Sequence, residues 1–392
     1  MRTARSPHRG RRPAASRALI APAVLASALV ATAAVGVIAG GRPVAALSTA
    51  SQAAAGGKGV IARTVANSSG WRVITTVGPA NEGVSGTLTA HSAADAWSVW
   101  TGTQYTAVER LVGTKWTRVP VPAKLTGYVR SAVAFDGDSA GDFWLFDSYR
   151  ANHALHFTGG KWTIAQIPAW VLPPRPGGGL SAVTTSAFGP DNVWVFGLDA
   201  RPYAAHYNGR SWAKVRLPTV PDSVRAVSPD DIWALRGDTA WYGNGKTWTA
   251  TKIPKAAGNP PEAFDNLTVT GRDSAWVWRT ILAPAPHTEA DVLHWNGSTW
   301  RPVAGTPADN LDSVAPDGSG GLWATGVNLN PSGFNLFYHL TGGRWSEVNP
   351  PVGLVDQAPE YLTWIPGTHS LWGTATGLTG RGAYGELIKH GP

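Results

Sequence analysis

The chain has 392 residues, with 46 Gly, 30 Pro, 20 Trp and no Cys, and its formal net charge is +8. A chain with 43% apolar residues and this much Trp can bury a large core, so the composition excludes a disordered or fibrous protein. The absence of Cys excludes disulfide bridges, zinc–thiolate sites and Cys nucleophiles.

Residues 1–46 have the order of segments that is typical of an export signal. Six Arg and no acidic residue occur in residues 1–17, an apolar run covers residues 18–39, and small residues precede an expected cleavage site after Ala46. A retained N-terminal membrane anchor is the alternative, because the apolar run is long enough to span a bilayer. The Arg11-Arg12 pair leaves both the general secretory and the twin-arginine route open. We therefore expect a secreted protein or one that is anchored by its N-terminus.

The net charge nearly disappears when this leader is removed. Residues 1–46 hold seven of the 33 Lys and Arg residues and none of the 25 acidic residues, so 26 basic and 25 acidic residues remain. A nucleic-acid-binding surface needs a basic excess, so we expect no nucleic-acid partner. Residues 47–69 are rich in Ala, Gly and Ser without periodicity, which predicts a flexible linker.

Two series of Trp residues divide residues 70–392 into repeats. The first series follows short turns rich in Asp, Gly and Ser, and comprises Trp97, Trp144, Trp194, Trp233, Trp276, Trp323 and Trp372. The second series lies mostly in Gly-x-x-Trp, and comprises Trp71, Trp116, Trp162, Trp212, Trp248, Trp300 and Trp345. Alternating apolar runs, Asn-Gly or Thr-Gly hairpin turns and terminal Pro residues predict four strands in each repeat. Seven such repeats predict an all-β, seven-bladed β-propeller of four-stranded antiparallel blades.

The two ends of the chain are predicted to share a blade. The last repeat stops at Pro392 after its third strand, and residues 69–74 form an additional strand ahead of the first complete repeat. A closed ring has no exposed sheet edge. We therefore expect the N-terminal strand to complete the seventh blade.

We interpret both Trp series as structural, because a large flat side chain at a fixed position fills the wedge between blades. Sugar-stacking platforms are the alternative. Four His residues share one position, six residues before their Trp: His156, His206, His294 and His339. Equivalent positions point outward around a ring and cannot converge on one ion at a bonding distance of about 2 Å. We predict structural roles for these His residues, with no metal site and no cofactor.

The Gly-x-x-Trp hairpins resemble the Asp-box of sialidase-type propellers, Ser-x-Asp-x-Gly-x-x-Trp, in their Gly and Trp but not in their Ser and Asp. The matching pairs are Gly113/Trp116, Gly159/Trp162, Gly209/Trp212, Gly245/Trp248, Gly297/Trp300 and Gly342/Trp345. The turn from Gly189 to Trp194 resembles those of streptogramin-lyase-type propellers, and kelch repeats are a looser likeness. These resemblances imply the fold of residues 70–392, and no activity, because the propeller fold hosts many functions.

Five long, irregular loops are predicted on one face of the ring: 168–180, 254–266, 279–291, 326–335 and 348–360. Long loops on a rigid scaffold often bind ligands, although loop length also drifts neutrally. The candidate binding residues on this face are Trp170, Arg175, His287, Glu289, Phe334 and Asp356.

The first strand of each blade is predicted to line a central channel. One aligned position there contains Thr89, Arg130, Ser181, Arg225, Thr268, Asp312 and Leu362. Arg130 and Arg225 are candidates to bind an anionic or carboxylate group near the channel mouth, with Asp222 and Asn310 beside them. Polar lining with bound water is the alternative interpretation.

No Gly-x-Ser-x-Gly elbow, His-Glu-x-x-His motif or phosphate loop occurs, so we predict no catalytic residue. A sialidase likeness would imply an Arg triad and a Tyr/Glu pair, which cannot be placed here. A streptogramin-type lyase would need a His and a Glu over the channel, for which His287 and Glu289 are the candidates. We predict a monomeric bacterial binding or scaffold module for protein or glycan, at or outside the cell surface. The alternative is an extracellular carbohydrate-active hydrolase or lyase, which would gather an acid and a base with perturbed pKa values in the channel.

Overall fold

The computed structural model describes residues 65–66, 70–79, 82–130, 132–138, 140–147, 152–172, 183–198, 201–258, 260, 262–282, 288–303, 310–327, 335–348, 359–379 and 382–392. All of these lie within the unit Lys58–Pro392. The predicted leader, residues 1–46, lies outside the described residues. None of the helices in the described ranges is long and apolar enough to cross a lipid bilayer.

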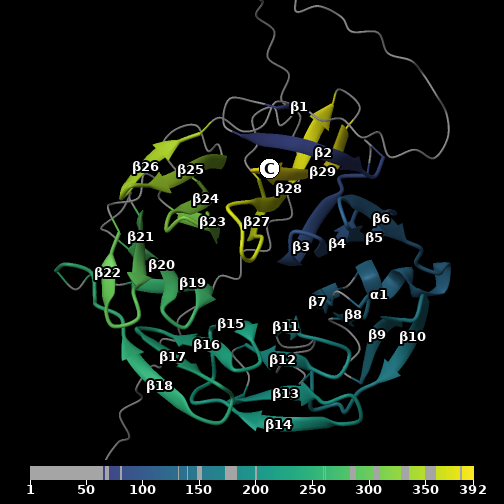
Figure 1. Cartoon of the computed structure of the whole chain (residues 1–392), viewed down its shortest axis with the longest axis horizontal. Coiled ribbons are helices and arrows are strands. Elements are labelled where there is room, and N and C mark those ends of the chain that lie inside the picture. The colour runs from purple at the N-terminus through teal and green to yellow at the C-terminus, as the bar shows by residue number, and fades with distance from the viewer. Residues whose placement is uncertain are drawn as a thin grey trace, which may run out of the picture. The chain divides into compact units, whose positions relative to one another are not determined.

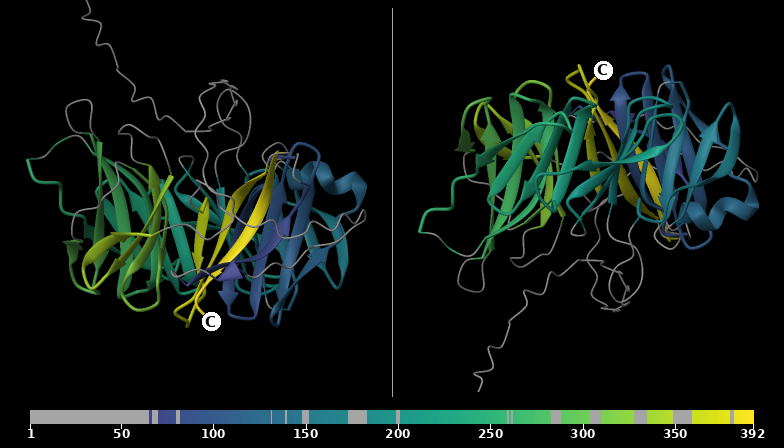
Figure 2. Two further views of the ribbon diagram at one scale, coloured as in Figure 1. Left: turned by 90° about the horizontal axis from the view of Figure 1, so that it is seen from above. Right: turned by 90° about the horizontal axis from the view of Figure 1, so that it is seen from below.

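Seven antiparallel sheets stand around a central channel, which confirms the predicted propeller (Figure 1). The first three blades comprise β3 (Ser85–Ser92), β4 (Asp95–Thr101), β5 (Thr106–Val112), β6 (Lys115–Val119), β7 (Ala132–Gly137), β8 (Phe143–Asp147), β9 (His153–Thr158), β10 (Lys161–Gln166), β11 (Val183–Ala187), β12 (Val193–Gly197), β13 (Tyr203–Tyr207) and β14 (Trp212–Arg216). The next three comprise β15 (Ser223–Ser228), β16 (Asp231–Arg236), β17 (Thr239–Gly243), β18 (Trp248–Lys252), β19 (Glu262–Gly271), β20 (Ser274–Leu282), β21 (Thr288–Trp295), β22 (Trp300–Pro302), β23 (Asn310–Pro316), β24 (Leu322–Val327), β25 (Asn335–Thr341) and β26 (Arg344–Glu347). The strands run between the two faces of the ring (Figure 2).

The seventh blade joins the two ends of the chain, as predicted. Its strands are β27 (Tyr361–Trp364), β28 (Leu371–Thr379), β29 (Gly382–His390) and β2 (Trp71–Val77), and β2 pairs with β29 from Trp71↔His390 to Val77↔Gly385. In Figure 1 the purple β2 lies beside the yellow β29. A further short strand, β1 (Val65–Ala66), pairs with the outer edge of β2. Two residues of the segment predicted as a linker thus extend this blade.

The Asn-Gly hairpin turns are held by side-chain caps. In the β13–β14 turn, Asn208 Oδ1 accepts hydrogen bonds from the backbone N–H groups of Arg210 at 3.1 Å and Ser211 at 2.9 Å. Gly209 has a φ of 85°, and a Cβ there would lie 2.1 Å from Asp191 Oδ1. Gly is therefore required both by the backbone conformation and by the close approach of the neighbouring turn.

The buried core consists of seven apolar clusters, each formed by two neighbouring blades. In four of the clusters a second-series Trp meets the first-series Trp of the preceding blade edge to face. The pairs and centroid distances are Trp116–Trp372 at 5.3 Å, Trp212–Trp144 at 5.9 Å, Trp300–Trp233 at 6.2 Å and Trp71–Trp323 at 5.3 Å. This geometry suits the ring quadrupoles, and it supports the interpretation of both series as inter-blade packing.

Each first-series Trp ring is also covered by a side chain from the third strand of its own blade. The covering residues are Arg110, His156, His206, Tyr242, His294, His339 and Lys389. The His rings stack on the indoles, as in Trp323–His339, where the centroids are 4.0 Å apart and the rings are 4° from parallel. Their Nε2 atoms bond turn residues, at 2.9 Å from His156 to Asp142 and 3.0 Å from His339 to Asp317. The four predicted structural His residues therefore tie strand to turn.

Helical structure in the described residues is limited to one connection between blades. The 3-10 turn η1 (Ala123–Leu125) and helix α1 (Thr126–Arg130) link β6 to β7. Leu125 and Val129 are buried against the cluster that blades one and two share. This packing holds α1 between blades one and two, and of its residues only Arg130 lines the cavity.

Candidate functional site

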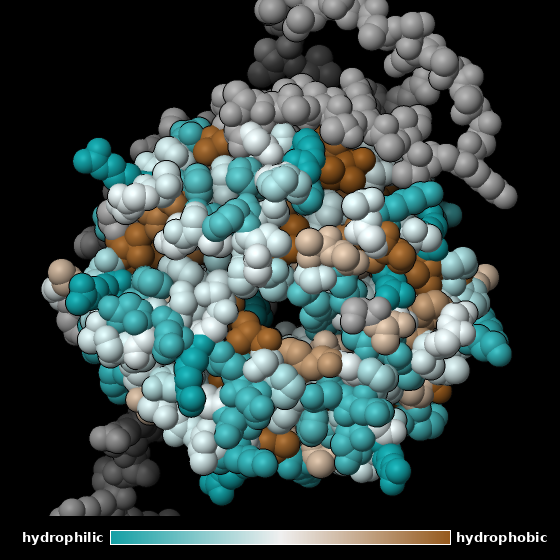
Figure 3. Space-filling model, viewed as in Figure 1, coloured by the Kyte–Doolittle hydropathy of each residue, from teal (hydrophilic) through white to brown (hydrophobic). Residues whose placement is uncertain are grey.

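The channel encloses a cavity of about 1150 Å³, lined by residues of the first strand of all seven blades. Figure 3 shows the opening at the centre of one face. We call the end at the inter-blade loops the loop mouth (Ser85, Arg130, Asp312 and Tyr361) and the end at the turns between first and second strands the turn mouth (His91, Asp95 and Asp138). All of these residues line the cavity.

The register of the sheets corrects the predicted channel position. The residues opposite the first-series Trp are Thr89, Asp136, Ser186, Arg225, Thr268, Ala315 and Thr363. The prediction was therefore right at Thr89, Arg225 and Thr268. It was wrong at Arg130, Asp312 and Leu362, which lie further toward the loops, and Ser181 lies outside the described residues, with Ser186 at the position predicted for it. In the first six blades the channel residue lies eight positions before the first-series Trp, and in the seventh blade it lies nine positions before it. This spacing can be read from the sequence alone.

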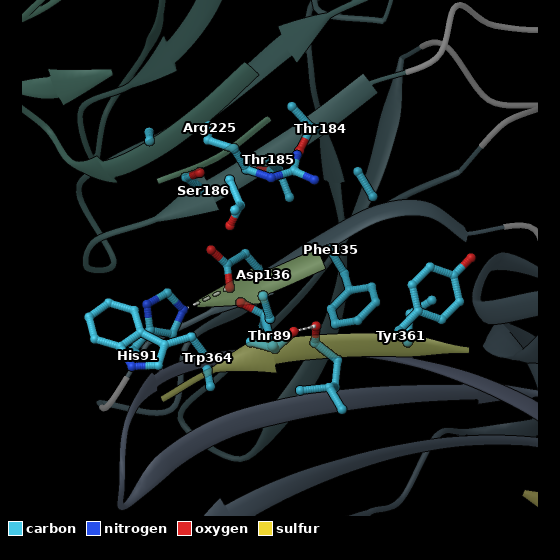
Figure 4. Close-up of a pocket in the computed structure, with 18 of the residues that line it drawn as sticks. Thr89, His91, Phe135, Asp136, Thr184, Thr185, Ser186, Arg225, Tyr361 and Trp364 are labelled. Carbon is cyan, nitrogen blue, oxygen red and sulfur yellow. Dashed lines mark hydrogen bonds and ion pairs between the residues drawn. The ribbon is translucent and has the colours of Figure 1, made fainter. Parts of the chain in front are cut away.

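Arg225 on β15 projects into the cavity, beside Thr184 and Thr185 of the neighbouring blade (Figure 4). Its Nη1 donates a 3.0 Å hydrogen bond to the carbonyl oxygen of Val224. The side chain faces the open channel, but the surrounding walls displace part of the water around it. This desolvation alone lowers the pKa of the guanidinium. No carboxylate in the described part of the chain pairs with Arg225. The site thus holds a cation without a counter-charge.

Arg130 and Asp312 also reach the cavity, but at the loop mouth and from positions other than those predicted. Arg130 is the last residue of α1 and is exposed. Asp312 lies on β23 at a bulge between Leu311 and Ser313, and burial raises the pKa of its carboxyl. Neither residue lies opposite a first-series Trp, as Arg225 does.

Asp222 and Asn310 do not line the cavity, contrary to the expectation that they lie beside the channel arginines. Asp222 pairs with the guanidinium of Arg236 and accepts a 2.9 Å hydrogen bond from the N–H of Gly237. Asn310 Oδ1 lies 3.4 Å from the hydroxyl of Thr280. The first contact lies at the end of the β15–β16 pair, and the second joins β20 of blade five to β23 of blade six.

The candidates on the long-loop face are only partly described. Arg175, His287, Phe334 and Asp356 lie outside the described residues. Trp170 is half-buried, stands edge to face with Tyr203 at 6.1 Å and has Lys214 Nζ 5.0 Å from its ring. Glu289 is an exposed residue of β21, opposite Ile281, because strands β20 and β21 extend through much of the predicted loop 279–291. The loop predicted at 254–266 also ends earlier, where β19 begins at Glu262.

The sequence interpretation missed a charged cluster at the turn mouth. His91 Nε2 lies 2.8 Å from Asp136 Oδ1, and Asp136 also accepts hydrogen bonds from the N–H groups of Gly137 at 2.9 Å and Ala187 at 2.8 Å. Asp136, with smaller contributions from Asp95 and Asp138, raises the pKa of His91 to about 9. His91 is therefore protonated at neutral pH, and this cluster connects blades one, two and three.

A pH-dependent stability follows from this ion pair. The pKa of His91 is about 9 in the folded chain against an ordinary value of 6.5, so its stabilising contribution is complete below pH 6.5 and is lost as the pH rises through 9. We expect the free energy of unfolding to fall by up to about 3 kcal/mol between pH 6.5 and 9.5, since one pKa unit corresponds to about 1.4 kcal/mol. Urea titrations across this range should show the decline in the native chain and a flatter profile in His91→Gln. The exposed His369→Gln is the control, and an unchanged pH profile in His91→Gln would contradict this account.

In the part of the chain that the structure describes, no three His, Asp or Glu side chains gather in a geometry suited to a metal ion. The charges that the channel does present are the free guanidinium of Arg225, the Arg130 and Asp312 side chains at the loop mouth, and the His91 cluster at the turn mouth. This arrangement offers hydrogen bonding and charge complementarity to a ligand that enters the channel.

Comparisons with known proteins identify the fold and nothing finer. No protein-family model matches the chain, and no curated protein matches its sequence. Among solved structures, the chain is similar to U3-55K, with 11% identity and a TM-score of 0.50 over 82% of this chain and 99% of that one. It also matches the extracellular domain of a hybrid two-component system from B. thetaiotaomicron, with 12% identity and a TM-score of 0.49 over 80% of this chain, and it spans 39% of the length of that protein. At 11% identity the likeness to U3-55K shows the fold alone, and a propeller fold fits a binding or scaffold module.

Proposed function

We propose that this chain is an exported bacterial binding module that takes an acidic group of a glycan into its central channel. The observation that carries the proposal is Arg225, whose charge faces the cavity without a carboxylate partner among the described residues. The leader in residues 1–46 supports export, and the mature chain acts as a monomer at or outside the cell surface.

An anionic group is the ligand chemistry that best suits Arg225. A charge that is partly removed from water is costly unless an opposite charge or hydrogen-bond acceptors satisfy it. A guanidinium matches a carboxylate through two parallel hydrogen bonds. A ligand carboxylate would therefore compensate the charge that the protein leaves open.

The surroundings of Arg225 favour a sugar acid over a protein side chain. Thr184 and Ser186 line the cavity on the neighbouring blade together with Thr185, whose hydroxyl donates a 2.7 Å hydrogen bond to the carbonyl oxygen of Trp194, and Thr268 lines it on the next (Figure 4). Hydroxyls both donate and accept hydrogen bonds, which matches the hydroxyl groups of a sugar. A narrow channel admits a sugar unit more readily than a folded protein surface.

The alternative of a hydrolase or lyase would require an acid and a base that can reach a substrate. The perturbed pair His91–Asp136 lacks the base, because His91 is protonated at neutral pH and cannot accept a proton, and both oxygens of Asp136 accept hydrogen bonds within the protein. Asp95 beside them is 5% exposed. We assign this cluster to structure.

The proposal is tested by calorimetric titration of the mature chain with trigalacturonic acid and with neutral maltotriose. We expect binding of the acidic trisaccharide only. Arg225→Gln should raise the dissociation constant by about 10- to 100-fold, because hydrogen bonds to charged groups contribute about 1.5–3 kcal/mol. The control is Arg216→Gln, an exposed residue of the outer strand β14, which should bind like the native chain.

Three outcomes would overturn the proposal. Equal binding of the neutral and acidic trisaccharides would remove the role of the anionic group. Unchanged affinity in Arg225→Gln would place the site elsewhere. Failure of a panel of uronic-acid oligosaccharides, together with capture of a secreted protein that depends on Arg225, would assign the channel to a protein ligand.

A further inference from the structure

A second group of side chains at the loop mouth carries charge of the opposite sign. Strands β23 and β27 lie side by side there, and the N–H of Leu362 donates a 3.0 Å hydrogen bond to Ser313 Oγ. The residues that precede these two, Tyr361 and Asp312, both line the cavity. The packing of β23 against β27 brings Asp312 and Tyr361 to the same part of the cavity wall, and Asp312 helps to raise the pKa of the Tyr361 phenol.

Tyr361 presents an aromatic ring at an open position. Its side chain is 49% exposed, whereas the Trp rings of the two series are mostly buried. Figure 4 shows Tyr361 at the opposite end of the cavity from His91 and Trp364. Burial is the main cause that raises the pKa of Tyr361, with Glu360 and Asp312 adding to it, so the phenol stays neutral at physiological pH.

The two carboxylates that act electrostatically on Tyr361, Asp312 and Glu360, lack a basic partner in the described residues. Asp312 makes no hydrogen bond there, and burial alone raises the pKa of its carboxyl. Glu360 accepts a hydrogen bond from the hydroxyl of Thr376, and burial raises its pKa as well. Arg130 lines the same mouth but is not among the charges that shift the pKa values of Asp312, Glu360 or Tyr361.

We propose that Asp312 and Tyr361 form a subsite for an ammonium group at the loop mouth of the channel. An ammonium is attracted to the face of an aromatic ring and donates charge-assisted hydrogen bonds to a carboxylate. Glu360, the residue before Tyr361, adds negative potential at the phenol. The subsite goes beyond the acidic-glycan proposal, because it concerns a different group of the ligand and does not need Arg225. A ligand that carries an amine and an acid at a suitable separation would engage both.

The test compares amines with matched neutral compounds by ligand-observed NMR titration of the mature chain near pH 6.5, where glucosamine is protonated. We expect glucosamine to bind at least 10-fold more tightly than N-acetylglucosamine, which keeps the sugar and loses the charge. Nα-acetyl-lysine amide provides the amine without a sugar. Binding of both amines supports an ammonium subsite, and binding of the lysine derivative alone supports the subsite with a peptide as the source of the amine.

Three variants assign the binding to these residues. Asp312→Asn and Tyr361→Ala should each weaken glucosamine binding at least 10-fold, whereas Tyr361→Phe keeps the ring and should stay within about 3-fold. Asp238→Asn, which removes an exposed carboxylate paired with Lys252 on the outer strand, is the charge-matched control. Thermal melting of Asp312→Asn and Tyr361→Phe verifies that the fold is intact.

The inference is overturned if N-acetylglucosamine binds as well as glucosamine, or if Asp312→Asn, with an unchanged melting temperature, binds glucosamine like the native chain. Arg225→Gln separates this inference from the proposed function. Loss of acidic-trisaccharide binding with retained glucosamine binding supports both sites. Absence of trisaccharide binding in the native chain, with glucosamine binding intact, refutes the proposed function only.

Discussion

Replacement of Trp71 by Ala is expected to lower the free energy of unfolding by about 3–5 kcal/mol, the usual cost of truncating a buried aromatic residue. Trp71 is fully buried and packs edge to face against Trp323 at 5.3 Å and Phe337 at 5.1 Å. These partners belong to the sixth blade, whereas β2 itself completes the seventh. The substitution therefore weakens both the inter-blade core and the pairing that closes the ring. Urea denaturation followed by Trp fluorescence measures the change.

The control for this prediction lies on the same strand. Thr76 is half-buried and alternates with the core-facing residues of β2, so Thr76→Ala should change stability by less than about 0.5 kcal/mol. Deletion of residues 70–77 should have a larger effect than Trp71→Ala, because it leaves the edge of β29 unpaired. An unchanged melting temperature in the deletion variant would show that ring closure does not stabilise the domain.

Replacement of Arg279 by Met is expected to cost about 3–5 kcal/mol, because it leaves two largely buried carboxylates without their counter-charge. Arg279 is 1% exposed. Its Nη2 lies 2.6 Å from Asp291 Oδ2, and its Nη1 lies 2.9 Å from Glu262 Oε2 and 2.6 Å from the carbonyl oxygen of Pro254. The guanidinium thus links three strands of blade five to the loop that comes from blade four. Equilibrium unfolding in urea measures the stability that is lost when Arg279 is replaced.

An exposed ion pair provides the matched comparison. The side chain of Arg236 is 48% exposed where it pairs with Asp222, and exposed pairs contribute about 0–1 kcal/mol. Arg236→Met should therefore be nearly neutral. The loss of unfolding free energy caused by Arg279→Met should be smaller when Asp291 is also changed to Leu, because the double variant removes one of the two buried carboxylates that lack a counter-charge. Equal stability losses in Arg236→Met and Arg279→Met would contradict the role of burial.

The blade count and the closure of the ring could be predicted from the sequence because both depend on periodic residues. The two Trp series mark the second and fourth strands of the blades, and each member packs at an equivalent place between blades. The additional strand at residues 69–74 and the short last repeat left one arrangement that gives all seven blades four strands. Local turn chemistry, as at Asn208 and Gly209, reinforced the strand boundaries.

The channel residues were predicted less well because their alignment was carried across the inter-blade loops, where the chain is irregular. Helix α1 and a bulge in β7 separate Arg130 from the channel position that Asp136 occupies. A bulge in β23 displaces Asp312 from the position of Ala315 in the same way. Counting back from the Trp within the hairpin avoids both irregularities, because hydrogen-bonded strand pairs keep their register.

Contacts between blades were beyond the sequence pattern. His91 and Asp136 are 45 residues apart in the chain, and nothing in either repeat distinguishes them from other polar turn residues. The lack of a carboxylate partner for Arg225 likewise depends on its neighbours, since the equivalent positions of the two neighbouring blades hold Ser186 and Thr268. Such sites depend on how the blades are set around the ring.

The pairing of β2 with β29 also determines the order in which the domain can fold as it is made. The ribosome produces β2 before any other strand of the seven blades, yet its partner is the last strand of the chain. Six blades can form from contiguous hairpins as they emerge, while β2 waits for its partner until β29 has been made, and such distant pairings are slow to form. Completion of the ring is therefore a late step of folding, and a chain carried across a membrane as an unfolded thread would complete it only on the far side.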